Sequence, residues 1–365
     1  MLAKVLVIKL RHHGDVLLST ALYRALVEHF PGIQVDVLIY KETTPLLENN
    51  PHVHRVLTID RKLKGWKRVK AELGLLLGVR REKYDAVIHL TDQWVGALIT
   101  RFSQAPKRVE MFYAKRDKPF WHNSFTDCVM PPARGKAHAV ELNLMCLSKL
   151  GVDPSSIKGK MALVPSEANQ LKVREWLGKE GIGGLNGGDF VLIHPAARWP
   201  FKCWEDDKFA EVVAYLLGKG YHVVLTCAPD PVEKAMTAEI ERLARQKATG
   251  NAVLLNLGGQ VSLPLVAAML SNCRFYIGVD SAPMHMAAAL DVPQIALFGP
   301  SWVEEWKPWS NRAKVIYAGD FGPLPHPDSI NTDDHTRLLR AIPTQVVLKE
   351  IEMLEQSTVP QSQIS

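Results

Sequence analysis

One segment in the last third of the chain combines a carboxylate, a hydroxyl and a histidine where a helix begins. An apolar run over residues 274–279 leads through Asp280 and Ser281 into a helical pattern with Pro283 in its first turn and His285 after it. A strand that feeds directly into a helix leaves backbone N–H groups and the positive end of the helix dipole at one spot, which favours phosphate. Asp280 repels phosphate, so we expect it to accept hydrogen bonds from sugar hydroxyls. The segment predicts a nucleotide-sugar pocket, and its alternative is an ordinary helix cap at Asp280 or Ser281.

The turn after the first predicted strand holds a second group of polar residues. Gly14 permits a tight turn, Asp15 follows it, and Arg11, His12 and His13 come just before. In open α/β folds, ligands bind at the carboxyl edge of the sheet, where this turn lies. Asp15 is therefore a candidate general base for a substrate hydroxyl, with helix capping as its alternative role. We expect no metal at the two histidines, because adjacent loop residues rarely converge on one ion.

A third candidate region follows the apolar run at residues 190–194. The loop after it carries two basic side chains, Arg198 and Lys202. If residues 190–194 form a strand, both lie at the carboxyl edge of the sheet, in the same region as Asp280. A lysine there would neutralise the charge that grows on a diphosphate when a sugar leaves its nucleotide. A surface lysine on a loop is the alternative interpretation.

Apolar runs alternate with helical patterns along the chain, which is typical of βαβ units and a parallel sheet. In the first half the predicted strands are residues 4–10, 34–39, 53–59, 84–90 and 108–112. In the second half they are residues 190–194, 221–226, 252–257, 274–279 and 294–298. The predicted fold class is therefore α/β, with two doubly wound halves.

Glycine marks the boundary between the two halves. Five of the eight residues from 181 to 188 are glycine, so we expect a flexible hinge there. This places a first domain at residues 1–180 and a second domain at residues 189–343. Residues 344–357 follow as an amphipathic helix, and the last residues of the chain are predicted to form a disordered tail.

Positive charge is concentrated in the first half of the chain. Residues 1–165 carry 26 Lys and Arg against 15 Asp and Glu, whereas the remainder carries 18 against 23. Much of the excess lies between Arg61 and Lys70, and includes Lys64 and Lys67. This pattern favours an anionic partner for the first domain: nucleic acid, a phosphorylated glycolipid or a membrane surface. A solvated basic helix without a partner is the alternative.

Composition and missing motifs argue against several protein classes. The apolar runs are far shorter than the ~20 residues of a membrane span, and the first residues lack a signal-peptide pattern. Neither the GxGxxG loop of dinucleotide-binding enzymes nor a P-loop occurs. The chain also has no Asp-x-Asp motif of the kind that binds a metal. Five scattered cysteines without a CxxC pair fit a reduced cytoplasmic protein with no zinc site.

Three segments together resemble a known family. They are residues 5–18, the loop over residues 194–204, and residues 278–300. In these segments, and over nearly the whole chain, the sequence resembles the lipopolysaccharide heptosyltransferases of Gram-negative bacteria, which form glycosyltransferase family 9. Residues 10–15 are most similar to the type III members (heptosyltransferase III), which add the branch heptose of the inner core.

The resemblance implies a GT-B architecture, with two Rossmann-like domains facing across a cleft and helix 344–357 packing back on the first domain. The second domain would bind the donor, ADP-L-glycero-D-manno-heptose. The first domain would bind the acceptor, which is the phosphorylated lipopolysaccharide inner core on lipid A. Heptose transfer would be inverting and would need no metal or other cofactor. The protein would be cytoplasmic, in peripheral contact with the inner membrane, and would bind no nucleic acid.

The functional residues of the family map onto this sequence position by position. The catalytic aspartate falls on Asp15 and the phosphate-binding lysine on Lys202. The donor-binding motif falls on Asp280, Ser281, Ala282 and His285, with Ala282 in place of the usual glycine. The complete expected donor set is Lys202, Arg198, Asp280, Ser281, Ala282, His285, Glu233 and Val261. The expected acceptor set is Arg11, His12, His13, Lys64, Lys67 and Lys70.

Two departures from the family pattern bear on the donor site. Ala196 and Ala197 replace residues whose hydroxyls contact phosphate in some members, and the ribose-binding glutamate maps only loosely onto Glu233. The pocket residues do not separate a type III enzyme from a heptosyltransferase I or II, or from a sibling that uses another nucleotide sugar. A non-catalytic protein that binds nucleotide sugars or anionic glycans is the alternative from another class, and Asp15 argues against it.

Overall fold

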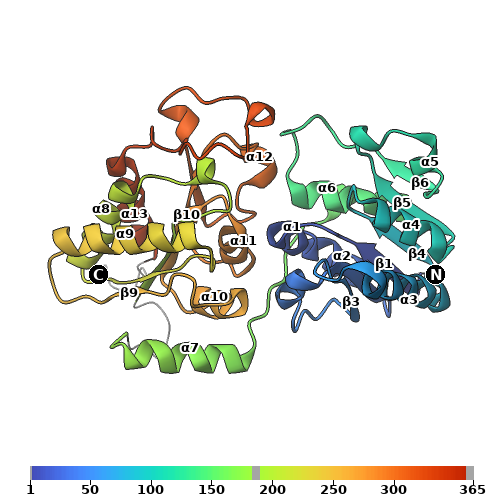
Figure 1. Ribbon diagram of the computed structural model, residues 1–365, viewed down its shortest axis with the longest axis horizontal. Helices are drawn as coiled ribbons and strands as arrows, with labels where there is room; N and C mark the ends of the chain where they lie inside the picture. Colours follow the sequence, from blue (N-terminus) through green and yellow to red (C-terminus); the bar gives the residue numbers. More distant parts are fainter. Residues whose placement is uncertain (1, 183–189, 359–365) are drawn as a thin grey trace. The chain divides into compact units, whose positions relative to one another are not determined.

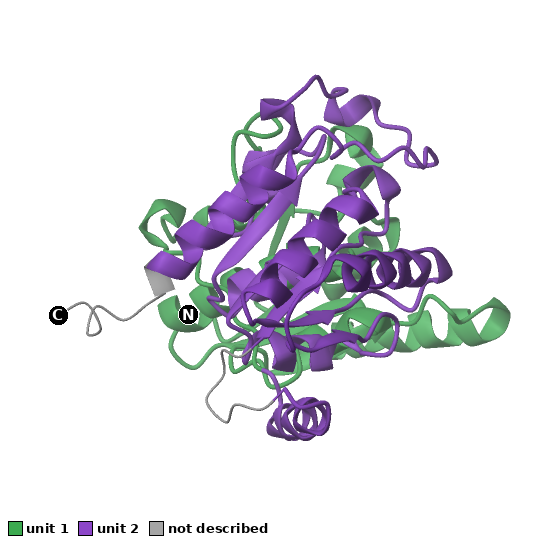
Figure 2. Cartoon of the chain, turned by 90° about the vertical axis from the view of Figure 1, so that its left-hand side faces the viewer, with its two compact units in different colours: residues 1–164 green, residues 165–365 purple. Residues whose placement is uncertain are grey.

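The computed structural model describes residues 2–182 and 190–358, and the chain divides into two compact units (Figure 2). Unit 1 comprises residues 1–164 and unit 2 comprises residues 165–365. Each unit contains a six-stranded sheet, and every strand pairing recorded within the described ranges is parallel. The predicted α/β class with two doubly wound halves is therefore confirmed.

The sheet of unit 1 has the strand order β3-β2-β1-β4-β5-β6, which is the order of the Rossmann fold. Its strands are β1 (Lys4–Ile8), β2 (Gln34–Tyr40), β3 (Arg55–Ile59), β4 (Ala86–His89), β5 (Lys107–Met111) and β6 (Asp127–Val129). In the central strand β1, residues 5–8 are all fully buried. A continuous apolar run such as this one is expected where helices cover both faces of a parallel sheet.

The helices of unit 1 form two groups, one on each face of the sheet. α2 packs against α6, and α3 packs against α4 (Figure 1). The helices are α1 (His13–Leu18), α2 (Thr20–His29), α3 (Gly65–Glu82), α4 (Trp94–Ser103), α5 (Pro119–His122) and α6 (Ala139–Met145). The 3₁₀ turns are η1 (Lys41–Leu46), η2 (Ala114–Arg116), η3 (Cys146–Leu150) and η4 (Pro154–Ser156).

Unit 2 repeats the topology of unit 1. Its strand order, β12-β11-β10-β7-β8-β9, is again the Rossmann order. The strands are β7 (Phe190–His194), β8 (His222–Leu225), β9 (Leu254–Asn256), β10 (Phe275–Val279), β11 (Gln294–Phe298) and β12 (Ala313–Tyr317). Strands β7, β10 and β11 are buried along their whole length, so the loops that follow them start from a rigid base.

The helices of unit 2 also form two groups. α8 packs against α9, and α10 packs against α11. The helices are α7 (Glu167–Lys179), α8 (Asp206–Gly218), α9 (Pro231–Lys247), α10 (Leu263–Leu270), α11 (Ala282–Ala289), α12 (Val303–Trp306) and α13 (Thr344–Thr358). The 3₁₀ turns are η5 (Pro200–Lys202), η6 (Ala318–Asp320) and η7 (Pro327–Ser329).

Two helices, α7 before the predicted boundary and α13 near the C-terminus, make contacts in unit 2. α7 packs against α10 in unit 2, although a boundary at residue 180 would assign it to the first domain. α13 packs against α8 and β11 of unit 2, where Val347 and Ile351 are fully buried. These two apolar residues lie one helical turn apart and join the core of unit 2. The packing of helix 344–357 on the first domain stays a prediction. The predicted glycine hinge falls largely on residues 183–188, outside the described ranges.

Two edge strands are absent from the sequence prediction. β6 has only three residues, and two of them, Asp127 and Cys128, are half-buried. β12 lies at the equivalent position in unit 2, as the outer partner of β11. Edge strands bury one side of their backbone only and need fewer apolar residues, which leaves a weak sequence pattern.

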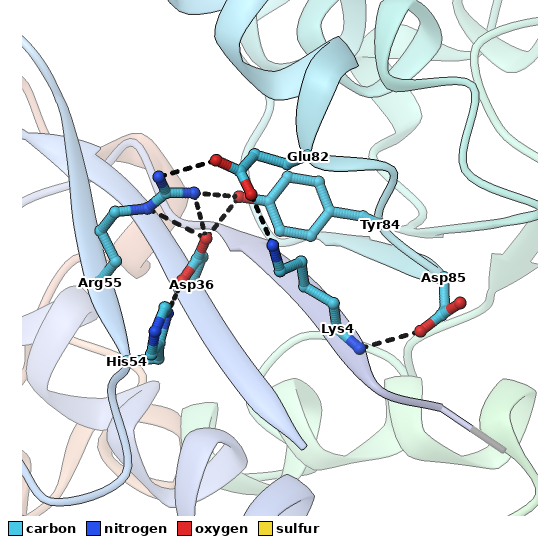
Figure 3. A network of polar contacts seen from close by, with 7 residues as sticks. All are labelled: Lys4, Asp36, His54, Arg55, Glu82, Tyr84 and Asp85. Atoms are coloured by element: carbon cyan, nitrogen blue, oxygen red, sulfur yellow. Dashed lines mark hydrogen bonds and ion pairs between the residues drawn. The ribbon is translucent and has the colours of Figure 1, made fainter. Parts of the chain in front are cut away.

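The amino-terminal ends of the unit 1 strands are joined by a dense ionic network (Figure 3). Fully buried Asp36 accepts hydrogen bonds from Arg55 (Nη2–Oδ2 2.6 Å) and from the Tyr84 hydroxyl (2.6 Å), and its Oδ1 lies 2.8 Å from His54 Nδ1. Glu82, at the end of α3, pairs with Arg55 at 2.8 Å and with Lys4 at 2.5 Å. The network ties β1, β2, β3 and α3 together at the edge away from the predicted site.

Candidate functional site

Three loops of unit 2 meet at the carboxyl edge of its sheet. They follow β7, β10 and β11, which are neighbours in the sheet. Lys202, in η5 after β7, donates from Nζ to Asp280 Oδ2 at 2.5 Å, and Asp280 directly follows β10. Ser301, after β11, donates from Oγ to the same carboxylate oxygen at 2.8 Å. The structure thus brings the predicted Lys202 and Asp280 into contact and adds Ser301 to them.

Asp280 is buried, with an exposed fraction of 7%, and yet is held in its charged form. Burial by itself raises the pKa of a carboxyl group, but the charge of Lys202 and its hydrogen bond outweigh that effect. The pKa of Asp280 therefore lies below its ordinary value. An ionised carboxylate only accepts hydrogen bonds, which suits a sugar hydroxyl, whereas the ammonium of Lys202 has three donors and needs only one for Asp280.

The first turn of α11 is not capped by a side chain. Its N-cap residue, Ser281, makes no capping hydrogen bond, and the carboxylate of Asp280 is engaged by Lys202 and Ser301 instead. The helix-cap interpretation of these two residues is therefore wrong. Ala282 begins the helix, and His285 is buried in its first turn. A helix N-terminus without a side-chain cap beside a lysine is an arrangement that favours an anionic ligand.

Packing fixes the loop that carries Lys202. Trp204 is fully buried and donates from Nε1 to the backbone oxygen of Ile342 at 3.2 Å. The Nζ atom of Lys202 lies 5.2 Å from the ring centre of Trp199. Ala196 and Ala197 are buried in the core of unit 2, so these two side chains point into the protein. The loop therefore positions its lysine and offers no hydroxyl at residues 196 and 197.

The other predicted donor residues lie on loops at the same edge of the sheet or just beyond them. Glu233, in the first turn of α9, accepts a hydrogen bond from the Ala228 amide (2.9 Å), and burial raises the pKa of its carboxyl group. Val261 is buried in the loop between β9 and α10. Arg198 is exposed, with its guanidinium carbon 5.8 Å from the ring centre of Trp199. Nucleotide contacts for these three residues remain predictions.

In unit 1, Asp15 lies in the first turn of α1, beside a buried lysine. Lys9 Nζ is 3.8 Å from Asp15 Oδ1 and 3.3 Å from Asn143 Oδ1 of α6. Burial lowers the pKa of the Lys9 ammonium. The N-cap of α1 is His12, which makes no side-chain capping bond, and the recorded ionic partner of Asp15 is Lys9. This geometry contradicts the helix-cap interpretation of Asp15 and leaves its carboxylate, with a side chain 20% exposed, beside a cation.

A second carboxylate at the same edge collects basic side chains. Asp92, after β4, lies 3.1 Å from Arg11 Nη2 and also pairs with Lys115, while Arg116 Nε donates to its backbone oxygen at 2.7 Å. Burial raises the pKa of Asp92, but Lys115 and Arg11 outweigh this effect and hold it below its ordinary value. Three cationic groups around one carboxylate leave an excess of positive charge, which suits an anionic substrate group.

The adjacent histidines lie in different surroundings. His13 is partly buried, with Nε2 3.1 Å from the backbone oxygen of Glu42, and burial lowers the pKa of its ring. His12 is exposed.

Within residues 2–182 and 190–358, no group of three or more His, Cys, Asp and Glu side chains is arranged to hold a metal ion. Over the same ranges, no helix is both long enough and apolar enough to cross a membrane.

The predicted acceptor lysines lie on the helix that follows β3. Lys64 is the N-cap of α3, and Lys67 and Lys70 are in its first two turns. All three side chains are exposed. Since α3 starts directly after β3, its basic end lies at the carboxyl edge of the sheet and its last turn lies at the amino edge. The helix therefore connects the edge that holds Asp15 with the edge that holds the Asp36 network.

Sequence reasoning missed several polar residues of these two edges. In unit 2 the missed residue is Ser301, and in unit 1 the missed residues are Lys9, Asp92, Lys115, Arg116 and Asn143. A usable signal exists for Lys9 and Asp92, because each follows a buried strand and therefore lies at the carboxyl edge. Lys115, Arg116 and Asn143 come from segments beyond the strand ends, and only the folded chain brings them there.

Comparison with known proteins places this chain among transferases. Residues 74–334 match the family model described as glycosyltransferase family 9 (heptosyltransferase). The sequence is 35% identical to lipopolysaccharide heptosyltransferase 3 of Escherichia coli, over 94% of this chain and 97% of that protein. A family 9 glycosyltransferase from Veillonella parvula matches the fold with a TM-score of 0.80 at 22% identity, covering 98% of each chain. The E. coli ADP-heptose LPS heptosyltransferase II matches with a TM-score of 0.75 at 23% identity, covering 98% of this chain and all of that chain.

Proposed function

The chain belongs to glycosyltransferase family 9, the heptosyltransferases, and from this premise we propose that it transfers a heptose from ADP-heptose to a heptose of the lipopolysaccharide inner core. The proposed reaction is that of heptosyltransferase III, which adds the branch heptose. The observation that carries the proposal is the contact of Lys202 and Ser301 with the buried carboxylate of Asp280 beside α11. It offers a cation that can bind a diphosphate and a carboxylate that can accept hydrogen bonds from sugar hydroxyls, and a nucleotide sugar contains both groups.

On the donor side, Lys202 and the first turn of α11 bind the diphosphate of ADP-heptose. Negative charge grows on the leaving ADP as the bond between sugar and phosphate breaks, and a fixed cation stabilises that charge. Asp280 holds Lys202 in place and, as an ionised carboxylate, accepts hydrogen bonds from sugar hydroxyls. Because lysine and helix amides supply the positive charge, the reaction needs no divalent cation.

On the acceptor side, Asp15 takes the proton from the attacking hydroxyl. Support comes from its place at the carboxyl edge of unit 1 and from its ion pair with Lys9, which keeps a cation beside the carboxylate. Direct attack by the acceptor hydroxyl on the anomeric carbon, with ADP leaving from the opposite face, inverts the configuration at that carbon. No covalent sugar–enzyme intermediate is part of this proposal.

The acceptor carries phosphate, and the basic surface of unit 1 is suited to it. Arg11 and Lys115 lie around Asp92 at the same edge as Asp15, and Lys64 is the residue before the first turn of α3, whose start lies at this edge. The proposal places the enzyme in the cytoplasm, in peripheral contact with the inner membrane, where its lipid A-linked acceptor is anchored. The basic charge of unit 1 supports such contact, because the surface of that membrane is anionic.

The test of this function is heptose transfer in vitro. Purified protein is mixed with ADP-L-glycero-D-manno-heptose and with core oligosaccharide from cells that lack this gene, and the products are analysed by mass spectrometry. We expect one heptose to be added per core molecule, together with release of one ADP. A protein that binds ADP-heptose but releases no ADP with this acceptor would be a binding protein, and transfer only to a heptose-free core would make it a type I enzyme.

Two further measurements test the stereochemistry and the metal requirement. Nuclear magnetic resonance of the product is expected to show an anomeric configuration opposite to that of the donor. Activity is expected to be unchanged in excess EDTA. Loss of activity in EDTA that Mg²⁺ or Mn²⁺ restores would contradict the role given to Lys202.

A further inference from the structure

Helix α3, which Figure 1 shows in unit 1, carries a row of large apolar side chains that are exposed. Trp66, Val69, Leu73 and Leu77 have exposed fractions of 75%, 43%, 50% and 59%. Their spacing of three, four and four residues places them in one row along the helix. We call this row the α3 ridge. A surface helix of a soluble domain normally turns such a face toward the core, so an exposed ridge indicates an interaction surface.

The opposite side of α3 already has its partners. Val79 is fully buried in the core of unit 1, and Leu75 and Leu76 pack against the same core. The α3 ridge is therefore a second apolar face on one helix. The neighbouring helix α4 adds two more exposed apolar residues, Leu98 and Phe102.

Basic side chains flank the ridge. Lys70 lies four residues after Trp66 and three before Leu73, and Arg80 and Arg81 lie three and four residues after Leu77. All three are exposed. At these spacings they neighbour the ridge on the helix surface.

Both carboxylates of α3 are neutralised by other residues. Glu72 pairs with Arg68 at 2.7 Å, and Glu82 pairs with Lys4 and Arg55 in the network of Figure 3. The outer face of α3 is therefore apolar along the ridge and positive beside it. This pairing of charge with an apolar face, including a tryptophan, is characteristic of helices that lie in the interface of an anionic bilayer.

We propose that the α3 ridge docks on an anionic phospholipid membrane. The ridge side chains enter the boundary between headgroups and acyl chains, while Lys70, Arg80 and Arg81 contact lipid phosphates. Such a helix lies in the membrane plane and does not cross it. The proposal rests on the proposed function in one respect: a lipid A-linked acceptor gives the docking its purpose, because it confines enzyme and acceptor to the same surface.

The direct test is vesicle flotation with the full-length protein. We expect binding to vesicles of phosphatidylethanolamine with phosphatidylglycerol, weaker binding to phosphatidylcholine alone, and partial release by high salt. The variant Leu73→Ser/Leu77→Ser should lose binding by roughly tenfold or more, because each buried leucine contributes strongly to partitioning. Leu171→Ser on α7, a leucine of similar exposure (53%), is the matched control and should bind as wild type.

A second copy of the chain is the competing occupant of the ridge. Sedimentation velocity separates the two cases. If the wild type sediments as a dimer, the double serine variant as a monomer, and neither floats with vesicles, the ridge is a protein interface and the proposal is overturned. Equal flotation of wild type and double variant also overturns it. Equal melting temperatures of the variants exclude a folding defect.

Transfer assays separate a failure of this inference from a failure of the proposed function. With a soluble, deacylated core as acceptor, the double serine variant should keep wild-type turnover. With the same core on lipid A in anionic vesicles, its rate should fall by about the same factor as its vesicle binding. If neither acceptor is glycosylated by the wild type, the proposed function fails, while flotation still decides whether the ridge binds membranes. Equal rates for wild type and variant on the vesicle-bound acceptor would contradict the proposal that the α3 ridge docks on the membrane.

Discussion

The two ends of the unit 1 sheet both carry charged side chains, and they use them differently. At the amino end, fully buried Asp36 accepts hydrogen bonds from Arg55 and Tyr84 at 2.6 Å, and Glu82 pairs with two cations at 2.5 and 2.8 Å (Figure 3). At the carboxyl end, Lys9 lies 3.8 Å from Asp15 and 3.3 Å from Asn143. The buried Nδ2 atom of Asn143 has no hydrogen-bond partner among the described residues.

This difference separates groups that hold the fold from groups that act on a ligand. A fully buried carboxylate such as Asp36, whose partners are all close, has its hydrogen bonds satisfied within the fold. Asp92 at the carboxyl end is equally buried, but its cations Arg11 and Lys115 are partly exposed, with side chains 32% and 63% exposed, and can also reach a ligand. A longer ion pair beside a buried donor without a partner is poorly satisfied by the protein itself. Residues of this kind occur where a ligand completes the hydrogen bonds. Variants at the two ends should therefore fail in different ways.

The largest expected effect is at Asp15. Asp15→Asn removes the proposed general base, and loss of such a base typically lowers turnover by ~10²–10⁴-fold. ADP binding and the melting temperature should stay close to wild type. The measurement is kcat with the soluble core acceptor, together with ADP titration by calorimetry. Turnover near wild type would show that Asp15 contributes to the fold and is not the general base.

Lys202 extends the comparison to the sheet of unit 2. Lys202→Ala should lower turnover by roughly 10²–10³-fold, because a fixed positive group matters most when the leaving ADP gains charge. The Kd for ADP-heptose should change less than kcat does. Lys208→Ala is the control, since Lys208 donates to the backbone of Ile342 near the C-terminal segment. A variant with weak donor binding and normal kcat would make Lys202 a ground-state binding residue.

Variants at the amino end of the unit 1 sheet should lower the free energy of unfolding and leave kcat unchanged. Asp36→Asn removes the buried charge that Arg55 contacts; because the Arg55 side chain is 39% exposed, the expected cost is that of lost hydrogen bonds to a charged group, about 1.5–3 kcal/mol. The milder variant Tyr84→Phe removes one hydrogen bond to the same carboxylate and should cost about 1–2 kcal/mol. Urea unfolding measures both, and kcat of the folded protein should be unchanged. A large fall in kcat without loss of stability would remove the distinction between the two ends.

Acid titration gives a third comparison of the two ends. His89 is the last residue of β4 and so lies at the carboxyl end of the sheet. Burial lowers its pKa to about 3, well below the unfolded value of 6.5. The unfolded chain therefore binds the proton more readily, so stability is full above pH 6.5 and falls by up to ~1.4 kcal/mol per pH unit below it. Lys4 and Arg55 lower the pKa of Glu82 to about 2, so its contribution is lost only between pH 4.5 and pH 2.

The measurement is the free energy of unfolding between pH 7 and pH 3. His89→Gln should flatten the curve between pH 6.5 and about pH 3, whereas Glu82→Gln should flatten it only below pH 4.5. His194, in unit 2, also has a pKa lowered by burial, to about 4, so His194→Gln is the control that separates unit 2 from unit 1. An unchanged slope in His89→Gln would show that this ring does not remain neutral in the folded protein.

The smallest effect is expected on the helix that connects the two ends. Lys64→Glu/Lys67→Glu/Lys70→Glu, near the carboxyl edge, should raise the KM for a soluble phosphorylated core severalfold and flatten its salt dependence, since each basic residue near such charge contributes ~1 kcal/mol at most. Arg80→Glu/Arg81→Glu, at the amino edge, should leave this KM unchanged. Equal salt slopes for wild type and the triple variant would mean that the basic start of α3 has no acceptor role.

Much of the fold could be read from the sequence because it depends on local apolar patterns. The continuous apolar runs of β1, β7 and β10 predict buried parallel strands, and the strand–helix order predicts two Rossmann-like halves. The edge strand β6 was not predicted, because it has only three residues and these are too few to show a periodic pattern of apolar side chains. The packing of α13 on α8 and β11 could not be predicted, since an amphipathic helix shows which side is apolar but not which core will receive that side.

The candidate site shows the same division. Asp15, Lys202 and Asp280 could be found from the sequence, because each lies in a loop or turn that follows a buried strand and ligands bind at that edge in open α/β folds. What tertiary structure alone decided is which charges are neighbours. Ser301 contacts Asp280 across 21 residues, Asn143 contacts Lys9 across 134, and Arg55 and Asp36 meet through the pairing of β2 with β3. Sequence patterns report the burial and direction of one segment, whereas the distances between polar groups on different segments exist only once the segments are packed.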